Sequence, residues 1–308
     1  MNDDRVFEPK LVNGPRRKKR AGLIILAVLI VGLLFFGSQF LSIYIDALWF
    51  RSVGYASVYW YKFRLGGVLF ISFFVATFLI FWLALWGLGR AFPEARKRPS
   101  VRLSSIEDIR EINLLPYIYR PAMWIISAGF GLMFAVSMSQ SWSDFALYLH
   151  SSASSATDPI FHRDISFYLF TLPVLEELSS WFTTIAVIVL LCVAGVALYV
   201  WYVDRVQGFG VSQIGGRAVG AASLAVSLFA VALAFSTYLS RYDLLQEAHE
   251  LISGVNYTDD HVQLPGLMLV TVALLGAALV LVINALAIRK LRIIWWSAGI
   301  IFGIWLIA

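Results

Sequence analysis

Seven long apolar stretches, separated by polar connections, organise this chain. They lie near residues 21–45, 64–88, 121–141, 178–203, 218–240, 265–288 and 293–308. Each of the first six contains about 20 or more residues without a charged side chain, the length that a helix rising ~1.5 Å per residue needs to cross ~30 Å of hydrocarbon. Because a backbone in lipid must satisfy its own hydrogen bonds, these stretches predict helices. The pattern therefore predicts an all-α fold, a polytopic membrane helix bundle with seven transmembrane helices.

The two ends of the chain need separate interpretation. A basic run, Arg16–Arg20, precedes the first apolar stretch, as in a signal peptide, but that stretch continues to Ile45 without a good cleavage site. We therefore expect a basic cytoplasmic tail at 1–20 and a seven-span membrane domain at 21–308. The last stretch has about 16 residues and reaches only ~24 Å, so the chain looks cut off within a span.

Composition agrees with a membrane protein and narrows the partners. The chain is 60% hydrophobic and 14% charged, too apolar for a soluble domain of 308 residues. The net charge of +5 does not indicate nucleic-acid binding, because the basic residues are spread over the connections and do not form one soluble face. The single cysteine, Cys192, lies inside an apolar stretch and forms no internal disulfide.

The distribution of Lys and Arg predicts the orientation. If the amino terminus is cytoplasmic, 19 of the 24 Lys and Arg residues fall on the cytoplasmic side, as the positive-inside rule requires. The five others are Arg51, Lys62, Arg64, Arg163 and Arg241. We therefore expect a bacterial inner (plasma) membrane protein with a cytoplasmic amino terminus and an extracytoplasmic carboxyl end.

Several connections predict local structure at the membrane surface. Aromatic residues fill 46–64, which we expect to lie along the membrane. Residues 93–120 predict a short amphipathic helix on the inner leaflet or a docking site for a cytosolic partner. In the outer loop, 142–149 forms an apolar helical face, Asp158-Pro159 predicts a helix start, and Ile165–Leu175 predicts an interfacial or re-entrant segment.

Side chains that could catalyse a reaction or bind a cofactor or metal are scarce in the apolar stretches. The interiors of the seven stretches contain no Asp, Glu, Lys, Arg or His, which argues against an intramembrane proton relay or haem ligand, and Asn284 is their main polar side chain. There is no G-x-S-x-G or H-E-x-x-H motif, so we assign no catalytic, cofactor-binding or metal-binding residues and no cofactor. Two small-residue pairs, Gly216/Gly220 and Gly299/Gly303, predict close helix packing.

The four histidines leave an outer metal site open as an alternative. His150, His162, His249 and His261 all fall on the outer side, together with Asp158, Asp164 and Asp259. Their spacing matches no metal motif. An acidic outer face of this kind is also typical of an ordinary solvated surface.

Three segments on the predicted outer side carry a resemblance to a known family. Residues 158–170, with the sequence DPIFHRDISFYLF, and residues 257–265, which contain YTDDH and LP, resemble hallmark stretches of uncharacterised protein family 0182. Residues 48–55, which begin with LWF and end with GY, resemble a third. The resemblance implies a large bacterial membrane protein whose seven amino-terminal spans precede an extracytoplasmic domain, and so a chain truncated before that domain. It implies no established activity. Asp158, His162, Asp164, Tyr257, Asp259 and His261 are the candidate functional residues.

These observations favour a non-enzymatic membrane anchor or scaffold, a subunit of a complex with membrane lipids and other membrane or extracytoplasmic proteins as partners. The first alternative is a transporter or channel component for lipid or another apolar envelope molecule, which would require a groove between spans large enough for an acyl chain. A membrane enzyme with an outer metal site is the third hypothesis.

Overall fold

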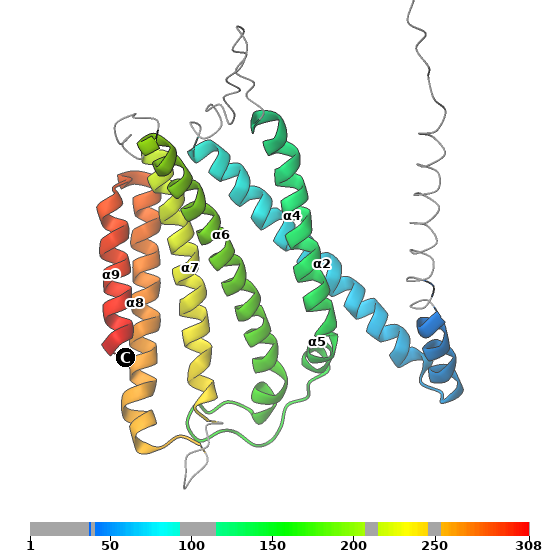
Figure 1. Ribbon diagram of the computed structural model, residues 1–308. Helices are drawn as coiled ribbons and strands as arrows, with labels where there is room; N and C mark the ends of the chain where they lie inside the picture. The colour runs from blue at the N-terminus through cyan, green and yellow to red at the C-terminus, as the bar shows by residue number, and fades with distance from the viewer. Residues whose placement is uncertain (1–36, 38–40, 93–114, 207–214, 246–253, 308) are drawn as a thin grey trace, which may run out of the picture. The chain divides into compact units, whose positions relative to one another are not determined.

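The structure is a computed structural model that describes residues 37, 41–92, 115–206, 215–245 and 254–307 (Figure 1). Its elements are α2 (Ala56–Ala91), α4 (Leu115–Gln140), α5 (Trp142–Leu149), η1 (Phe167–Thr171), α6 (Leu172–Val206), α7 (Gly216–Asp243), η2 (Asp259–Gln263), α8 (Leu264–Ile283), η3 (Asn284–Ile288) and α9 (Leu291–Ile307), where η marks a π-helical turn. The described residues contain no strand beyond an isolated bridge between Thr157 and Asp164. The all-α prediction is confirmed for this part of the chain.

Five helices of the described residues are long and apolar enough to cross a membrane. They are Ala56–Ala91, Tyr119–Gln140, Phe167–Tyr202, Gly216–Asp243 and Asp259–Ile288. Each overlaps one of the predicted apolar stretches over nearly its whole length. Most of the first predicted span, 21–45, lies outside the described residues, and the last corresponds to α9, whose 17 residues reach ~26 Å. The structure therefore supports five of the seven predicted spans.

Two predictions about the outer loop are wrong. Ile165–Leu175 is not a separate interfacial segment, because it runs through η1 directly into α6 and forms the first turns of that long helix. Asp158 does not start a helix either. It begins a turn, and the helix starts at Ile165 after Asp164. The predicted helix at 142–149 is confirmed as α5.

The chain divides into two compact units, residues 1–63 and 64–308. In the first unit, a helix at 41–52 and the start of α2 meet through a turn at Gly54, whose φ of 85° favours glycine. Tyr59 is buried there and donates a hydrogen bond from its hydroxyl to the Ile43 carbonyl at 2.7 Å. Phe50 and Phe63 pack against the Tyr59 ring, so aromatic side chains hold this turn together.

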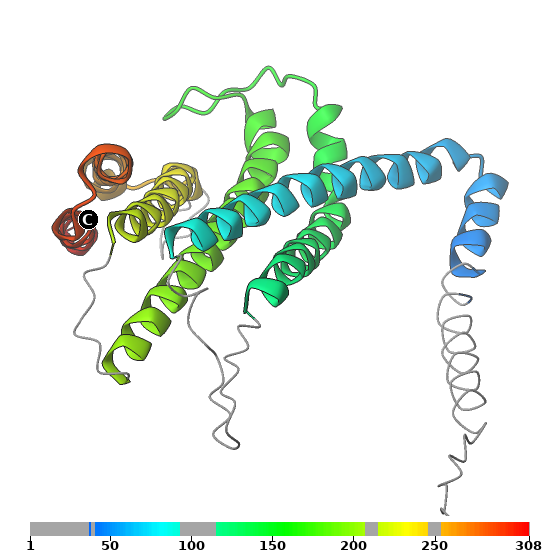
Figure 2. The ribbon, with the colours of Figure 1, turned by 90° about the horizontal axis from the view of Figure 1, so that it is seen from above.

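The second unit is built around α7. This helix packs against α6 on one side and α8 on the other, and α9 follows α8 as an antiparallel neighbour (Figures 1 and 2). Aromatic and branched side chains form its main core; Phe81, Phe134, Ile185 and Ala225 bring together α2, α4, α6 and α7. The Trp181 indole donates a hydrogen bond to the Thr77 hydroxyl at 3.1 Å, which joins α6 to α2 inside this core.

The small-residue prediction for 216–220 is confirmed. A Cβ on Gly220 would lie 3.1 Å from the backbone carbonyl oxygen of Ala285, so α7 and η3 approach each other as closely as a glycine allows. In contrast, nothing lies within 4 Å of the positions that Cβ atoms would take on Gly299 or Gly303. The basic tail and nearly all of the predicted amphipathic segment at 93–120 lie outside the described residues.

Candidate functional site

Residues 158–170, the first of the family-like motifs, begin with a tight turn that ends where the helix leading into α6 starts. The Asp158 N–H donates to the Arg163 carbonyl at 2.8 Å, and the Ile165 N–H donates to the Ala156 carbonyl at 3.1 Å, which closes the turn like a short hairpin. His162 lies at its tip with a left-handed φ of 53°, and its side chain is exposed. The motif thus brings Asp158 and Asp164 to the two sides of one turn and leaves His162 pointing away from the core.

Both aspartates of this turn use their carboxylates to organise the backbone. Asp158 is 8% exposed, and its Oδ2 accepts hydrogen bonds from the Phe161 N–H and from the Tyr168 hydroxyl. Asp164 accepts from the Ser166 N–H at 2.8 Å and from the Ser154 N–H at 2.9 Å. These N–H donors stabilise the carboxylate form and hold the pKa of Asp164 below its usual value. The arrangement is typical of helix capping and turn formation.

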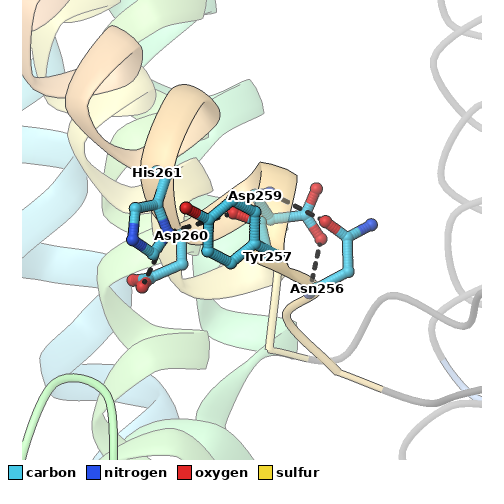
Figure 3. Close-up of polar contacts among 5 residues, drawn as sticks. All are labelled: Asn256, Tyr257, Asp259, Asp260 and His261. Carbon is cyan, nitrogen blue, oxygen red and sulfur yellow. Dashed lines mark hydrogen bonds and ion pairs between the residues drawn. The ribbon is translucent and has the colours of Figure 1, made fainter.

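The second motif, at 257–265, also lies at a helix start (Figure 3). The Asn256 N–H donates to Asp259 Oδ2 at 2.9 Å, and the Asp259 N–H donates to Asn256 Oδ1 at 2.8 Å, so the two side chains cap each other's backbone. Asp259 is 2% exposed. The carboxylate is therefore enclosed at the first turn of η2, where it fixes the chain as it enters α8.

Tyr257 and His261 form the exposed edge of the second motif. Their rings stack with centroids 4.0 Å apart, and His261 Nδ1 lies 3.2 Å from the Tyr257 carbonyl oxygen and 3.3 Å from an Asp260 carboxylate oxygen (Figure 3). Within the described residues, no group of three or more His, Cys, Asp or Glu side chains is arranged to hold a metal ion. His249, one member of the outer metal hypothesis, lies outside those residues.

The aromatic residues of the first motif pack on the end of α7. Tyr242 is buried, and Phe161, Phe167 and Tyr168 surround its ring at centroid distances of 4.9, 5.2 and 6.0 Å. The Arg241 guanidinium donates to the Tyr242 hydroxyl at 2.8 Å and stacks 3.7 Å from the centre of the Tyr238 ring. The DPIFHRDISFYLF segment therefore joins the start of α6 to the end of α7.

A separate apolar groove lies at the opposite end of these helices. It has a volume of about 600 Å³ and is walled by α2, α6, α7 and η3. We call it the arginine groove; its lining residues are Ile80, Leu83, Ala84, Gly87, Leu88, Arg90, Ala91, Val189, Val193, Arg217, Gly220, Ala221, Leu224, Ala225, Leu228, Ala285 and Arg289. Apart from the three arginines, every residue in this set is apolar. The groove therefore offers a hydrocarbon surface with positive charge at one end.

Three different helical elements bring these arginines together. Arg90 lies in the last turn of α2, Arg217 in the first turn of α7, and Arg289 directly after η3. All three side chains are exposed. Arg289 adopts a left-handed φ of 55°, and its Nε donates to the Ala285 carbonyl at 3.4 Å. This left-handed residue ends the helix and turns its side chain back over the groove wall.

Asn284 fixes the backbone beside the groove. Its side chain is completely buried, and its Nδ2 donates to the Ser223 hydroxyl at 2.8 Å and to the Lys290 carbonyl at 3.1 Å. Its Oδ1 accepts from the Lys290 N–H at 3.0 Å. One amide therefore joins α7, η3 and the connection to α9, which gives a structural role to the polar side chain that the sequence singles out within the spans.

Comparison with known proteins identifies the family of this chain. The sequence model of one family, described as an uncharacterised protein family, matches residues 23–308. This chain belongs to the uncharacterised protein family UPF0182. It is 33% identical over 236 residues to a UPF0182 protein of Cupriavidus necator, covering 75% of this chain and 25% of that protein. It is 30% identical over 311 residues to a UPF0182 protein of Mycobacterium bovis, covering 94% of this chain and 30% of that protein.

The UPF0182 relatives are much longer than the present chain. A relative from Corynebacterium jeikeium, 26% identical, matches 96% of this chain but only 28% of its own length. The chain thus spans between about a quarter and a third of the curated relatives it matches. No solved structure matches the chain.

In this UPF0182 chain, sequence reasoning found the outer motifs but missed the arginine groove. The sequence gives the three groove arginines a role only in predicting orientation, because Arg90, Arg217 and Arg289 come from three connections far apart in sequence. Their common position follows from how α2 and α7 pack. The Gly216/Gly220 pair was the sequence signal nearest to the groove, since Gly220 is part of its wall.

Proposed function

We propose that this region of a UPF0182 protein is a membrane-embedded unit that binds an anionic phospholipid in the arginine groove, as part of handling an apolar envelope molecule. The observation that carries the proposal is a groove of about 600 Å³ with apolar walls and three arginines at its end. That volume lies within the ~300–1,000 Å³ range of ligand pockets in proteins.

The chemistry of the groove fits one acyl chain and one phosphate. An acyl chain in the groove would cover Leu83, Leu88 and Leu224, and the hydrocarbon contact favours any lipid equally. The arginines add selectivity, because guanidinium groups donate several hydrogen bonds to phosphate oxygens in a fixed geometry. Each basic side chain near an anionic membrane surface contributes ~1 kcal/mol, or about fivefold in affinity.

The orientation predicted by the positive-inside rule agrees with this ligand. It directs Arg90, Arg217 and Arg289 to the cytoplasmic leaflet of the inner membrane, where anionic headgroups are accessible. Seven spans with a cytoplasmic amino terminus and an extracytoplasmic carboxyl end remain the topology that we propose for the whole region.

An anchor or scaffold role is the second candidate. It is favoured by the hydrogen-bonded motifs, where Asp158, Asp164 and Asp259 accept hydrogen bonds from backbone N–H groups, and by relatives that extend far beyond this region. In this role, Tyr257 and His261 would form part of a contact surface for another protein. The two candidates are compatible, since an anchor can also bind lipid.

The test is native mass spectrometry of the protein after gentle extraction from its source membrane. We expect stoichiometric anionic phospholipid on the wild type and at least a fivefold loss of it in Leu224→Trp, which fills the groove. Leu279→Trp is the matched control, because Leu279 is an exposed α8 residue outside the groove. The double variant Arg217→Gln/Arg289→Gln should still bind lipid but should no longer prefer lipids with anionic headgroups.

Two results would contradict the lipid proposal. One is a wild-type protein without bound lipid but with a stoichiometric protein partner, which would favour the scaffold. The other is equal lipid loss in Leu224→Trp and Leu279→Trp, which would mean that the lipid is bound to the general membrane-facing surface.

A further inference from the structure

An arginine enclosed by aromatic rings lies at the end of α7 opposite the arginine groove. Arg241 is in the last turn of α7, and its guanidinium carbon lies 3.7 Å from the centre of the Tyr238 ring and 4.7 Å from that of Tyr242. The Phe161 ring of the 158–170 motif lies 5.5 Å away, and Met268 of α8 contacts the same guanidinium. We call these five residues the Arg241 site. It brings together α7, α8 and the turn before α6.

The hydrogen-bond donors of this guanidinium are only partly used. Arginine has five N–H donors in a fixed fork. Nη2 donates to the Tyr242 hydroxyl at 2.8 Å, whereas Nη1 donates to the Met268 sulfur at 3.4 Å, and a thioether is a weak acceptor. Nε is a buried atom without a hydrogen-bond partner among the described residues. A desolvated donor of this kind favours a ligand that supplies an acceptor.

The positive charge of Arg241 has no counter-charge in the described part of the chain. No carboxylate there forms an ion pair with it. Asp158 of the adjoining turn directs its carboxylate to the Phe161 N–H and to the Tyr168 hydroxyl. The negative end of the α7 dipole favours a cation at this position, but it does not supply an acceptor for Nε. Aromatic rings and a thioether also solvate a charge less well than water does, so the site suits an anion.

A second arginine contacts the same aromatic cluster. The Arg163 guanidinium carbon lies 5.4 Å from the centre of the Phe167 ring, and Phe167 packs against Tyr242 with centroids 5.2 Å apart. Arg163 is exposed, and it too forms no ion pair with a carboxylate among the residues that the structure describes. The two guanidinium groups therefore add to one positive potential on this end of the bundle.

The surroundings of the site favour phosphate as the anion. Guanidinium groups bind phosphate oxygens through two parallel N–H donors. The site lies at the end of a helix that is long and apolar enough to cross a membrane, which is the level of lipid headgroups. From Met268, the exposed side chains of Val272 and Leu275 continue along one face of α8, because they follow at spacings of four and three residues. An acyl chain attached to the phosphate can lie along this face.

We propose that the Arg241 site binds a phosphate group, with the Arg241 Nε–H and an unused Nη N–H as donors. The flexible Met268 side chain moves aside for the ligand, and Arg163 adds attraction from the same aromatic cluster. The position at the end of a span favours a phospholipid headgroup as the source of the phosphate, and inorganic phosphate is the other source. The site shares no residue with the arginine groove, so it does not depend on lipid binding there.

The test is photo-crosslinking of the whole chain in a non-ionic, phosphate-free detergent with a phosphatidylglycerol that carries a diazirine in its acyl chain. Mass spectrometry of the labelled peptides then separates the α8 segment 268–275 from the arginine groove. We expect labelling of this segment to fall about fivefold in Arg241→Gln, and to fall less in Arg241→Lys, which keeps the charge but not the fork. Arg205→Gln is the matched control, because Arg205 lies 5.1 Å from the Trp201 ring but at the far end of α6.

Two further probes distinguish the sources of the phosphate. A diacylglycerol with the same diazirine lacks phosphate and should label the α8 segment about fivefold less than the phospholipid does. This comparison uses the wild type alone, so it tests the proposal even if a variant does not fold. Inorganic phosphate that raises the melting temperature of the wild type, but not that of Arg241→Gln, would support free phosphate as the ligand; no such shift, with phospholipid labelling as expected, would support the headgroup.

Three results would overturn the phosphate site. The first is equal labelling of the α8 segment by the diacylglycerol and the phospholipid. The second is labelling of Arg241→Gln at the wild-type level. The third is a loss in Arg205→Gln as large as that in Arg241→Gln, which would mean that any arginine stacked on an aromatic ring has the same effect.

Discussion

Three aspartates of the two motifs at 158–170 and 257–265 accept hydrogen bonds from backbone N–H groups. Asp158 and Asp259 are almost completely buried while doing so, and Asp164 is the least enclosed of the three. Each carboxylate lies at a point where a loop enters a membrane-spanning helix. The first turn of a helix leaves N–H groups without intrahelical partners. These three carboxylates therefore stabilise the points where the loops join the helices.

The pKa of Asp164 predicts how this turn responds to acid. Because its folded pKa lies below the usual value of about 3.8, ionised Asp164 stabilises the folded turn, and this contribution is present above that value. It is lost as the pH falls through the lower folded pKa. We therefore expect the melting temperature of the wild type to fall below about pH 4, measured by circular dichroism in detergent.

The control for this prediction is Asp164→Asn. The amide oxygen still accepts a hydrogen bond but does not titrate, so this variant should be less stable at neutral pH and should show a smaller decrease on acidification. An identical pH profile for the two proteins would assign the acid response to other carboxylates.

At the scale of elements, the close contact of α7 with η3 depends on one missing side chain. The Cβ in Gly220→Ala would meet the backbone carbonyl of Ala285 at 3.1 Å, and a backbone atom yields less easily than a side chain. Overpacking costs ~1–3 kcal/mol, which exceeds the ~1 kcal/mol gained from the higher helix propensity of alanine. We expect Gly220→Ala to lower the free energy of unfolding by about 1 kcal/mol.

Gly276→Ala is the matched control for this substitution. Gly276 lies in α8, and nothing lies within 4 Å of the Cβ position there, so the change should be neutral or stabilising. Unfolding in a denaturing detergent measures both variants. Equal free energies for Gly220→Ala and Gly276→Ala would mean that α7 and η3 are not in close contact.

The sequence predicted the helices better than their ends. Apolar stretches located five spans, because length and hydrophobicity are local properties. The start of α6 was missed, since Glu176 and Glu177 interrupt the apolar pattern and suggest a boundary. In the structure, Glu176 lines a cavity together with Asp243 of α7, and Glu177 accepts a hydrogen bond from Ser141, so both carboxylates lie beside residues far away in sequence.

The candidate site was predictable only in part for the same reason. Residues 256–261 are consecutive, and their capping role can be derived from local spacing. The arginine groove combines residues from separate helices, and its position depends on helix packing, which one sequence does not reveal. The π-helical turns η1 and η2, which overlap the two motifs at 158–170 and 257–265, were likewise not predicted.

At the scale of the whole molecule, the topology is open to a direct test. In a Cys192→Ser background, which removes the single native thiol, we place a cysteine at exposed Ser154 or at exposed Gly215. The proposed orientation predicts that a membrane-impermeant thiol reagent labels Ser154→Cys in intact cells. It should label Gly215→Cys only after the membrane is permeabilised.

Labelling of Gly215→Cys in intact cells would reverse the orientation. The arginine groove would then open toward the outer leaflet, and the lipid proposal would need a ligand from that leaflet. Labelling at both positions in intact cells would mean that the membrane was leaky, which a cytoplasmic marker protein detects.

The length of α2 connects the arginine groove to the thickness of the bilayer. Its uncharged stretch between Arg64 and Arg90 has 25 residues, or ~38 Å at ~1.5 Å per residue, against a hydrocarbon core of ~30 Å. A helix with such mismatch tilts, and its tilt changes when the surrounding membrane becomes thinner or thicker. Ile80–Ala91 of α2 form one wall of the groove, so a change in tilt alters its width. Groove occupancy therefore depends on the acyl-chain length of the host membrane as well as on the charge of the ligand.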